Sequence, residues 1–217
     1  MLTIALPTGR SLDNCIKILE TAGLPVEKLK DAKRNLVIED GDYKYLLAKP
    51  TDVPFIVEWG GASLGIVGND VTEESRARLV HIADTGLGKC VMAIAAPKES
   101  LERFGVTEGA ELAKVSKDLA GLRVATKYVN LAERTFKELG IQIKILKLNG
   151  SIELAPVQGI ADCIFDVVQT GSTLRANGLA VVKATLDVSL HLVASESAVE
   201  INEPFFAKTV KAIKESL

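Results

Sequence analysis

The order of apolar and polar positions predicts strands and helices that alternate along the chain. Continuous apolar runs, such as LTIAL at 2–6 and LGIVG at 64–68, are typical of strands buried on both faces. The strictly alternating stretch IQIKILKLN at 141–149 is typical of a strand with one exposed face. Because helical patterns separate most of these runs, the sequence predicts an α/β fold with mostly parallel sheets.

The remaining elements follow from the same patterns and from turn and capping signals. The residues DGD at 40–42 indicate a hairpin, and Asn130 with Glu133 is expected to cap the helix that follows. Further strands are expected at 35–40, 43–49, 89–97, 122–128, 163–168 and, as a pair, within 179–195. Helices are expected at 11–22, 53–61, 111–121, 131–140, 151–159 and 203–216.

Two sets of strands and helices meet twice along the chain, near residues 86–90 and again near 178–182. A double crossing implies that a second lobe is inserted into the first, with a cleft between them for a ligand. The predicted first lobe comprises 1–88 plus 179–217, and the predicted second lobe comprises 89–178.

Composition narrows the class of protein. The chain has 217 residues, of which 47% are hydrophobic and 25% charged, so it can bury a core without disulfides or metals. Its formal net charge of −2 provides no general attraction for nucleic acid or an anionic membrane. Three dispersed cysteines and a start without signal-peptide features predict a cytoplasmic protein with reduced, buried thiols.

Several common active sites have no counterpart in the sequence. The two histidines, His81 and His191, are far apart in the chain, which argues against a zinc site or a catalytic triad and favours structural roles. There is no Walker loop for a nucleotide. Trp59 is expected in the core rather than on the surface as a stacking platform.

The sequence DVVQTGST at 166–173 places an acid in an apolar strand and a glycine turn directly after it. Gly171 can adopt a positive φ, which lets successive amides converge on an anion, and the following helix adds its N-terminal amides. Asp166 can accept hydrogen bonds from ribose hydroxyls. Hydroxyl donors are added by Thr170, Ser172 and Thr173. The alternative is a short helix capped by Ser172 or Thr173, with Asp166 directed to solvent.

Cations and glycine turns occur beside other predicted strand ends. The cations are Arg10, Arg34, Lys49, Lys127 and Arg175. Each can be an ordinary solvated residue, and only the position at a strand end makes it a candidate for a phosphate clamp. The turns PTGR at 7–10, WGGASLG at 59–65 and QTGST at 169–173 could line the same cleft.

The stretch NGSIELAPVQGIADCIFDVVQTGSTLRANGL at 149–179 resembles the signature of the ATP phosphoribosyltransferase family. Other stretches match the family in the same order: IALPTGR, KPTDVPFIVEWG, LGIVGNDV, GLGKC and VATKY. The resemblance covers nearly the whole chain. It implies two α/β lobes similar to type II periplasmic binding proteins and an enzyme of histidine biosynthesis.

The resemblance also implies a reaction. Adenine N1 of ATP would attack the anomeric carbon of phosphoribosyl pyrophosphate (PRPP) and displace pyrophosphate, with Mg²⁺ carried on PRPP rather than held by the protein. The PRPP-binding residues would be Asp166, for the ribose hydroxyls, and Thr170, Gly171, Ser172 and Thr173, for the 5′-phosphate. The ATP-binding residues would be Gly9, Arg10, Gly60 and Gly61. The catalytic cations, which stabilise the departing charge, would be Arg10, Arg34 and Lys49.

The length is similar to the short form of the family, which lacks a C-terminal regulatory domain. The implied partners are other copies of the chain and a separate regulatory subunit resembling histidyl-tRNA synthetase. Thr8, Lys49, Ser63 and Asn69 depart from common family residues, namely lysine or serine, arginine, aspartate and lysine in that order. A non-catalytic paralogue that binds PRPP or a nucleotide, and a two-lobed small-molecule binding protein, remain alternatives.

Overall fold

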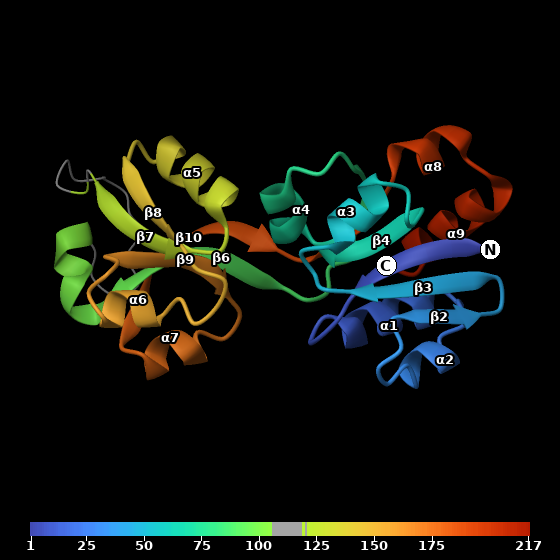
Figure 1. The fold of residues 1–217 in the computed structure, drawn as a ribbon, viewed down its shortest axis with the longest axis horizontal. Helices are drawn as coiled ribbons and strands as arrows, with labels where there is room; N and C mark the ends of the chain where they lie inside the picture. Colours follow the sequence, from blue (N-terminus) through green and yellow to red (C-terminus); the bar gives the residue numbers. More distant parts are fainter. Residues whose placement is uncertain (106–118, 120) are drawn as a thin grey trace. The chain divides into compact units, whose positions relative to one another are not determined.

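The computed structural model describes residues 1–105, 119 and 121–217, which form two compact units (Figure 1). One unit comprises Met1–Gly88 and Ser189–Leu217, and the other comprises Lys89–Val188. Each unit has its own sheet and its own apolar core. The helix expected at 111–121 falls almost entirely outside the described residues.

The second crossing between the units lies later in the chain than the sequence predicted. It falls between Val188 and Ser189 rather than at 178–179. The reason is strand β10 (Leu179–Val188), which pairs antiparallel with β6 (Cys90–Pro97) from Leu179 to Val188. Because this pairing spans the whole strand, β10 belongs to the sheet of the second unit.

The first unit contains a 6-stranded sheet with helices on both faces (Figure 1). Helices α1 (Leu12–Thr21) and α9 (Pro204–Glu215) pack on one face, and α3 (Val53–Glu58) packs on the other. In spatial order the strands are β2 (Val37–Asp40), β3 (Tyr43–Ala48), β1 (Leu2–Pro7), β4 (Leu64–Gly68), β11 (Leu190–Ala194) and β5 (Val80–Asp84). The remaining helices are α2 (Glu27–Lys30), α4 (Asn69–Ser75) and α8 (Glu196–Ile201).

The second unit is built around a 5-stranded sheet. Figure 1 shows α5 (Val129–Glu138) on one face and two short helices, α6 (Leu154–Val157) and α7 (Ser172–Ala176), on the other. The spatial order is β10, β6, β9 (Cys163–Val168), β7 (Leu122–Thr126) and β8 (Ile143–Lys147). The 3₁₀ helix η1 (Lys98–Phe104) packs with α5 into the same core.

The predicted α/β class is confirmed, but both sheets are mixed rather than mostly parallel. Among the described strands, β1 pairs parallel with β3 and β4, and β7 pairs parallel with β8 and β9. The other pairings are antiparallel, because β2–β3 is a hairpin and because β10 and β11 return beside strands already in place. The first sheet therefore has a parallel centre with antiparallel edges, whereas in the second sheet β8, β7 and β9 are parallel on one side and β6 and β10 are antiparallel neighbours on the other.

Two local predictions are wrong. Helix α5 begins at Val129 with Tyr128 as its N-cap residue and has no side-chain cap hydrogen bond, so Asn130 and Glu133 do not form the expected cap. Trp59 is 85% exposed rather than buried, and it is the C-cap residue of α3. In the described part of the chain, no helix is both long and apolar enough to cross a bilayer.

Candidate functional site

Asp166 and the glycine turn lie at the end of the second sheet where the parallel strands β7 and β9 have their carboxyl ends. Strands β7 and β9 run parallel with Ala125 opposite Ile164, so both strands end at the same edge. Lys127 follows the first of them, and the turn at 169–171 follows the second. Strand β6 begins at this edge as well, since Val91 lies opposite Val168.

Thr126 joins the ends of β7 and β9. It is fully buried, and its hydroxyl donates to the carbonyl oxygen of Phe165 at 2.6 Å while accepting from the amide of Tyr128 at 2.8 Å. Both contacts are short enough to be strong hydrogen bonds. Thr126 therefore fixes the backbone one residue before Asp166.

Asp166 lies within β9, opposite Ala93 of β6. The residue as a whole is partly exposed, but its Oδ1 atom is buried. A carboxylate oxygen is costly to bury and must be compensated by polar groups. The alternative in which Asp166 simply points into solvent is therefore wrong.

The glycine turn leads directly into helix α7. Gly171 has φ of +67° and is the N-cap residue of α7, so the alternative in which Ser172 or Thr173 occupies the cap position is also wrong. The hydroxyl oxygens of Thr170 and Ser172 are 2.9 Å apart, and both residues are exposed. Leu174 is buried and anchors the turn to the core. Thr173 is exposed beside them.

In the first unit, three predicted cations come to one edge of the sheet. The parallel pairing of β1 with β3 ends with Pro7 opposite Ala48, so the Gly9–Arg10 turn and Lys49 both follow that edge. The antiparallel strand β2 starts at the same edge with Val37, three residues after Arg34.

These cations are available for a ligand. Arg10, Arg34 and Lys49 are exposed, and within the described ranges none of them forms an ion pair with a carboxylate. Exposed arginine and lysine side chains of this kind suit a polyphosphate, because each can donate several hydrogen bonds.

The structure separates Gly60 and Gly61 from the Gly9–Arg10 turn. Helix α3 starts after the carboxyl end of β3 and runs back, so the two glycines precede the amino end of β4. Ser63 donates to the carbonyl oxygen of Thr3, near the amino end of β1. A parallel strand–helix–strand connection returns the chain to the opposite end of the sheet, and the assignment of Gly60 and Gly61 to ATP binding stays a prediction.

The two histidines lie side by side, which their separation in the sequence concealed. Their rings meet edge to face with centroids 5.7 Å apart on the neighbouring strands β5 and β11. Nε2 of His191 is 3.7 Å from Oδ1 of Asp84. Burial lowers the pKa of His191, and Asp84 opposes that shift. Among the described residues no group of three or more metal-binding side chains is arranged to hold a metal ion.

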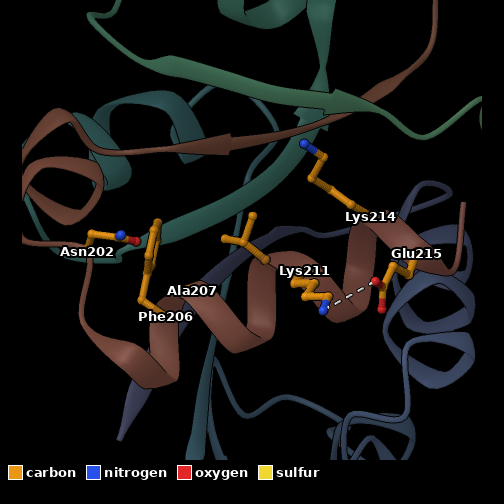
Figure 2. A pocket seen from close by; sticks show the side chains of 7 residues that line it. Asn202, Phe206, Ala207, Lys211, Lys214 and Glu215 are labelled. Atoms are coloured by element: carbon orange, nitrogen blue, oxygen red, sulfur yellow. Dashed lines mark ion pairs between the residues drawn. The ribbon is translucent and has the colours of Figure 1, made fainter.

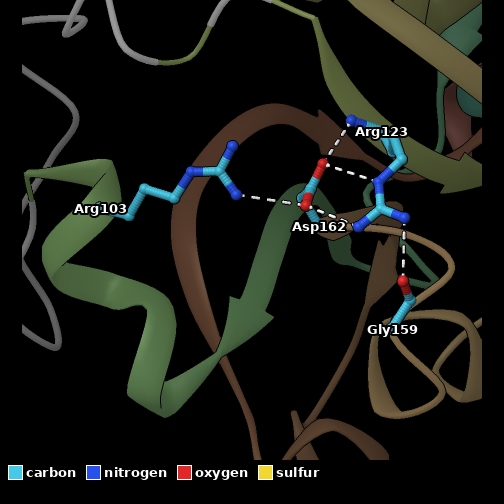
Figure 3. Close-up of polar contacts among 4 residues, drawn as sticks. All are labelled: Arg103, Arg123, Gly159 and Asp162. Atoms are coloured by element: carbon cyan, nitrogen blue, oxygen red, sulfur yellow. Dashed lines mark hydrogen bonds and ion pairs between the residues drawn. The ribbon is translucent and has the colours of Figure 1, made fainter.

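Two further features lie away from the candidate residues. Figure 3 shows Arg103 and Arg123 both contacting Asp162, at 3.2 Å and 3.0 Å, where β9 begins. The hydrogen bonds from Arg123 lower the pKa of Asp162 to about 2. Figure 2 shows a groove of about 400 Å³ along α9, whose lining includes Phe206 and Lys214. The Asp162 cluster links the start of β9 to β7 and η1, and the groove contains none of the predicted site residues.

Comparison with known proteins decides the family. The family model described as ATP phosphoribosyltransferase matches residues 49–217. The ATP phosphoribosyltransferase of Thermoanaerobacter sp. (strain X514) is 38% identical over 216 residues, which is 99% of this chain and 95% of that protein. The chain belongs to the ATP phosphoribosyltransferase family. The corresponding protein of Carboxydothermus hydrogenoformans is also 38% identical, over 98% of this chain and 92% of its own length.

Solved structures agree with this family assignment. The ATP phosphoribosyl transferase (HisG:HisZ) complex from Thermotoga maritima matches 100% of this chain and 97% of that chain with a TM-score of 0.80 and 27% identity. The periplasmic aliphatic sulphonate binding protein from Escherichia coli matches 99% of this chain and 68% of its own, with a TM-score of 0.56 and 15% identity. At that identity the likeness concerns the fold alone, and it confirms the predicted type II binding-protein architecture.

One departure from the common family pattern has a structural role. Asn69 is buried, its side-chain oxygen accepts from the amide of Ser189 at 3.1 Å, and its own amide donates to the Ser189 carbonyl. The hydroxyl of Ser189 donates in turn to Asp84 at 2.6 Å. Asn69 therefore ties β4 to the start of β11 in this member of the family.

Proposed function

We propose that the chain catalyses the first step of histidine biosynthesis, the transfer of the phosphoribosyl group of PRPP to N1 of the adenine of ATP with release of pyrophosphate. The observation that carries this proposal is the edge where β9 ends. There a single short segment of a phosphoribosyltransferase family member supplies both an acid for a sugar and a turn for a phosphate.

In the proposed complex, the second unit binds the ribose 5-phosphate part of PRPP. The 5′-phosphate is held by the hydroxyls of Thr170, Ser172 and Thr173 and by the backbone around Gly171. Asp166 accepts hydrogen bonds from the ribose hydroxyls. Two strand residues, Val167 and Val168, lie between Asp166 and the turn, and three residue steps along a strand cover about 10 Å. A sugar phosphate with its hydrogen bonds at both ends can bridge such a separation.

The first unit supplies positive charge. Arg10, Arg34 and Lys49 are proposed to meet the polyphosphate groups, and Gly9 with Arg10 is proposed to approach ATP. Mg²⁺ enters as part of the substrate, bound to the pyrophosphate of PRPP. Lysine presents a compact charge where arginine presents a planar fork, so Lys49 provides a less directional contact than arginine would.

The chemical demand on the protein is mainly alignment and charge stabilisation. Adenine N1 is a weak nucleophile, and holding it against the anomeric carbon can supply about 7–11 kcal/mol of the barrier. Cations placed where the pyrophosphate charge develops lower the barrier further. Neither role requires a covalent intermediate with a side chain.

The proposed assembly is a cytoplasmic homo-oligomer with a separate regulatory subunit that resembles histidyl-tRNA synthetase. The support is the Thermotoga maritima structure, which is a HisG:HisZ complex, and the similar length of the curated relatives. Feedback by histidine would then act through the partner.

A coupled pyrophosphate assay tests the proposal. The protein is incubated with ATP and Mg²⁺–PRPP, alone and with a candidate regulatory subunit, and we expect pyrophosphate release that requires both substrates. Absence of product in both mixtures, with PRPP binding still detected by calorimetry, would favour the non-catalytic paralogue. Absence of PRPP binding would exclude the PRPP-binding paralogue as well.

A further inference from the structure

The side chain of Arg175 lies back over the glycine turn. A Cβ atom placed on Gly171 would be 3.0 Å from Nη1 and 3.9 Å from Cζ of Arg175. The guanidinium therefore occupies the space beside the turn that a side chain at position 171 would take. The positive φ favours glycine at 171, and an alanine there would have to displace the guanidinium.

The local fold explains why Arg175 takes this position. Its amide donates to the carbonyl oxygen of Gly171 at 3.0 Å, which places the residue one helical turn after the glycine. Side chains of a helix lean toward its N-terminus, so a long side chain at 175 reaches back toward 171. Buried Leu174 fixes the rotation of α7 and thereby the direction of its neighbour.

The charge of Arg175 is not neutralised by the protein. Across the described residues, Arg175 has no carboxylate within ion-pair distance. The same turn carries the hydroxyls of Thr170 and Ser172, 2.9 Å apart and exposed. A guanidinium beside Gly171, in a turn that also carries hydroxyl and amide donors, matches a phosphate monoester, whose oxygens accept from all three kinds of group.

We propose that Arg175 is a further PRPP-binding residue, which contacts the 5′-phosphate and favours its dianionic form. This inference rests on the proposed function, because it assumes that the turn binds the 5′-phosphate. It assigns to α7 a charge that works together with the backbone of the turn. It also predicts that substitutions of Gly171 and Arg175 have non-additive effects on binding of the 5′-phosphate.

Calorimetry with ribose 5-phosphate and with Mg²⁺–PRPP tests the proposal. We expect Arg175→Ala to weaken binding of both about tenfold, as for loss of a charge-assisted hydrogen bond at an exposed site, and Arg175→Lys to recover part of the loss. Arg134→Ala on α5, on the other face of the sheet, removes the same charge and should leave both affinities unchanged. ATP binding should be unchanged in all three variants.

Two additional readouts separate a phosphate contact from a structural role. A phosphate monoester loses its second proton near pH 6, so wild-type affinity for ribose 5-phosphate should rise between about pH 5 and about pH 7.5. The rise should be smaller in Arg175→Ala. Gly171→Ala should displace the guanidinium, so it should weaken binding less in the Arg175→Ala background than in the wild type.

The possible failures are distinguishable. If the wild-type protein binds ribose 5-phosphate and Arg175→Ala binds it equally well, the role of Arg175 is refuted while the proposed function stands. An equal loss of ATP and PRPP affinity would also refute it. If the wild-type protein binds neither PRPP nor ribose 5-phosphate, the turn is not a sugar-phosphate site and the proposed function itself fails.

Discussion

The two sheets present their candidate residues in different ways. In the second unit, one stretch from Asp166 to Arg175 contains the acid, the turn and the cation that lies over it. In the first unit, Arg10, Arg34 and Lys49 come from separate segments and meet at one edge only because β1, β2 and β3 pair with a defined register. A site contained in one segment can be predicted from the sequence. A site assembled by strand pairing can be predicted only when the order of the strands in the sheet is known.

The contrast has an energetic counterpart. The turn in the second unit is anchored to the core by buried Leu174, three residues after the left-handed Gly171. The cations of the first unit are exposed side chains whose rotamers a ligand must order, at a cost of about 1–2 kcal/mol for each long side chain. We therefore expect the second unit to determine binding of the sugar phosphate and the first unit to contribute mainly to the transition state.

The largest expected effect is on turnover in the first unit. Lys49→Ala or Arg10→Ala should lower kcat about 10²–10³-fold, because each removes a cation proposed to stabilise departing charge. Thermal melting should be unchanged, since both side chains are exposed. Lys17→Ala, an exposed lysine on α1, is the matched control for steady-state kinetics. An unchanged kcat in Lys49→Ala and Arg10→Ala would show that these two cations do not act in catalysis.

The next effect is on substrate binding in the second unit. Asp166→Ala and Thr170→Ala should weaken PRPP binding about 10–100-fold by removing hydrogen bonds to the sugar phosphate. Isothermal titration with ATP should give unchanged affinity for both variants. If ATP and PRPP affinity fell by the same factor, the turn would not be specific for the sugar phosphate.

A pair of glycine variants compares the glycine turn of the second unit with Gly60 in the first unit. Gly171 and Gly60 have φ of +67° and +74°, so an alanine at either position should cost about 1 kcal/mol of unfolding free energy in urea denaturation. Only Gly171→Ala should also weaken PRPP binding, because Gly60 lies at the opposite end of α3 from the cationic edge. Loss of substrate affinity in Gly60→Ala would contradict that separation.

The smallest expected effect concerns Asp162, at the other edge of the second sheet. Its pKa is lowered from 3.8 to about 2, chiefly by hydrogen bonds from Arg123. A depressed pKa stabilises the folded state above the unfolded value, and this stabilisation is lost as pH falls from 3.8 toward about 2.

Asp162→Asn tests that assignment. The variant should be less stable than the wild type by about 1 kcal/mol near neutral pH, where solvent screens an exposed ion pair, and the difference should vanish at low pH. Denaturant midpoints measured over that range check this. PRPP affinity should be unaffected. A loss of PRPP affinity would show that Asp162 contributes to the PRPP site.

Much of the fold was predictable because apolar runs and turn residues specify local structure. The runs at 2–6 and 64–68 became β1 and β4, and the DGD hairpin joined β2 to β3 as expected. Strand direction was less predictable. Nothing in the local pattern of 179–188 shows that β10 pairs antiparallel with β6, so the boundary between the units was misplaced.

The candidate site shows the same division. Asp166 and the turn at 170–173 were identified from adjacent residues, whereas the position of Gly60 and Gly61 relative to Gly9 and Arg10 depends on the path of α3. The contact between His81 and His191 also arises from pairing of β5 with β11, across more than half of the chain. Residues that are adjacent in the sequence can be recognised as one site from the sequence alone. Which distant residues lie beside them depends on the strand order and direction.

The most direct test of the central claim is a crystal structure of the protein with Mg²⁺–PRPP. We predict that the 5′-phosphate lies within hydrogen-bond distance of Thr170, Ser172 and the backbone amides of the turn, and that the ribose hydroxyls lie against Asp166. A 5′-phosphate bound instead at the Gly9–Arg10 turn, with Asp166 away from the sugar, would contradict the account.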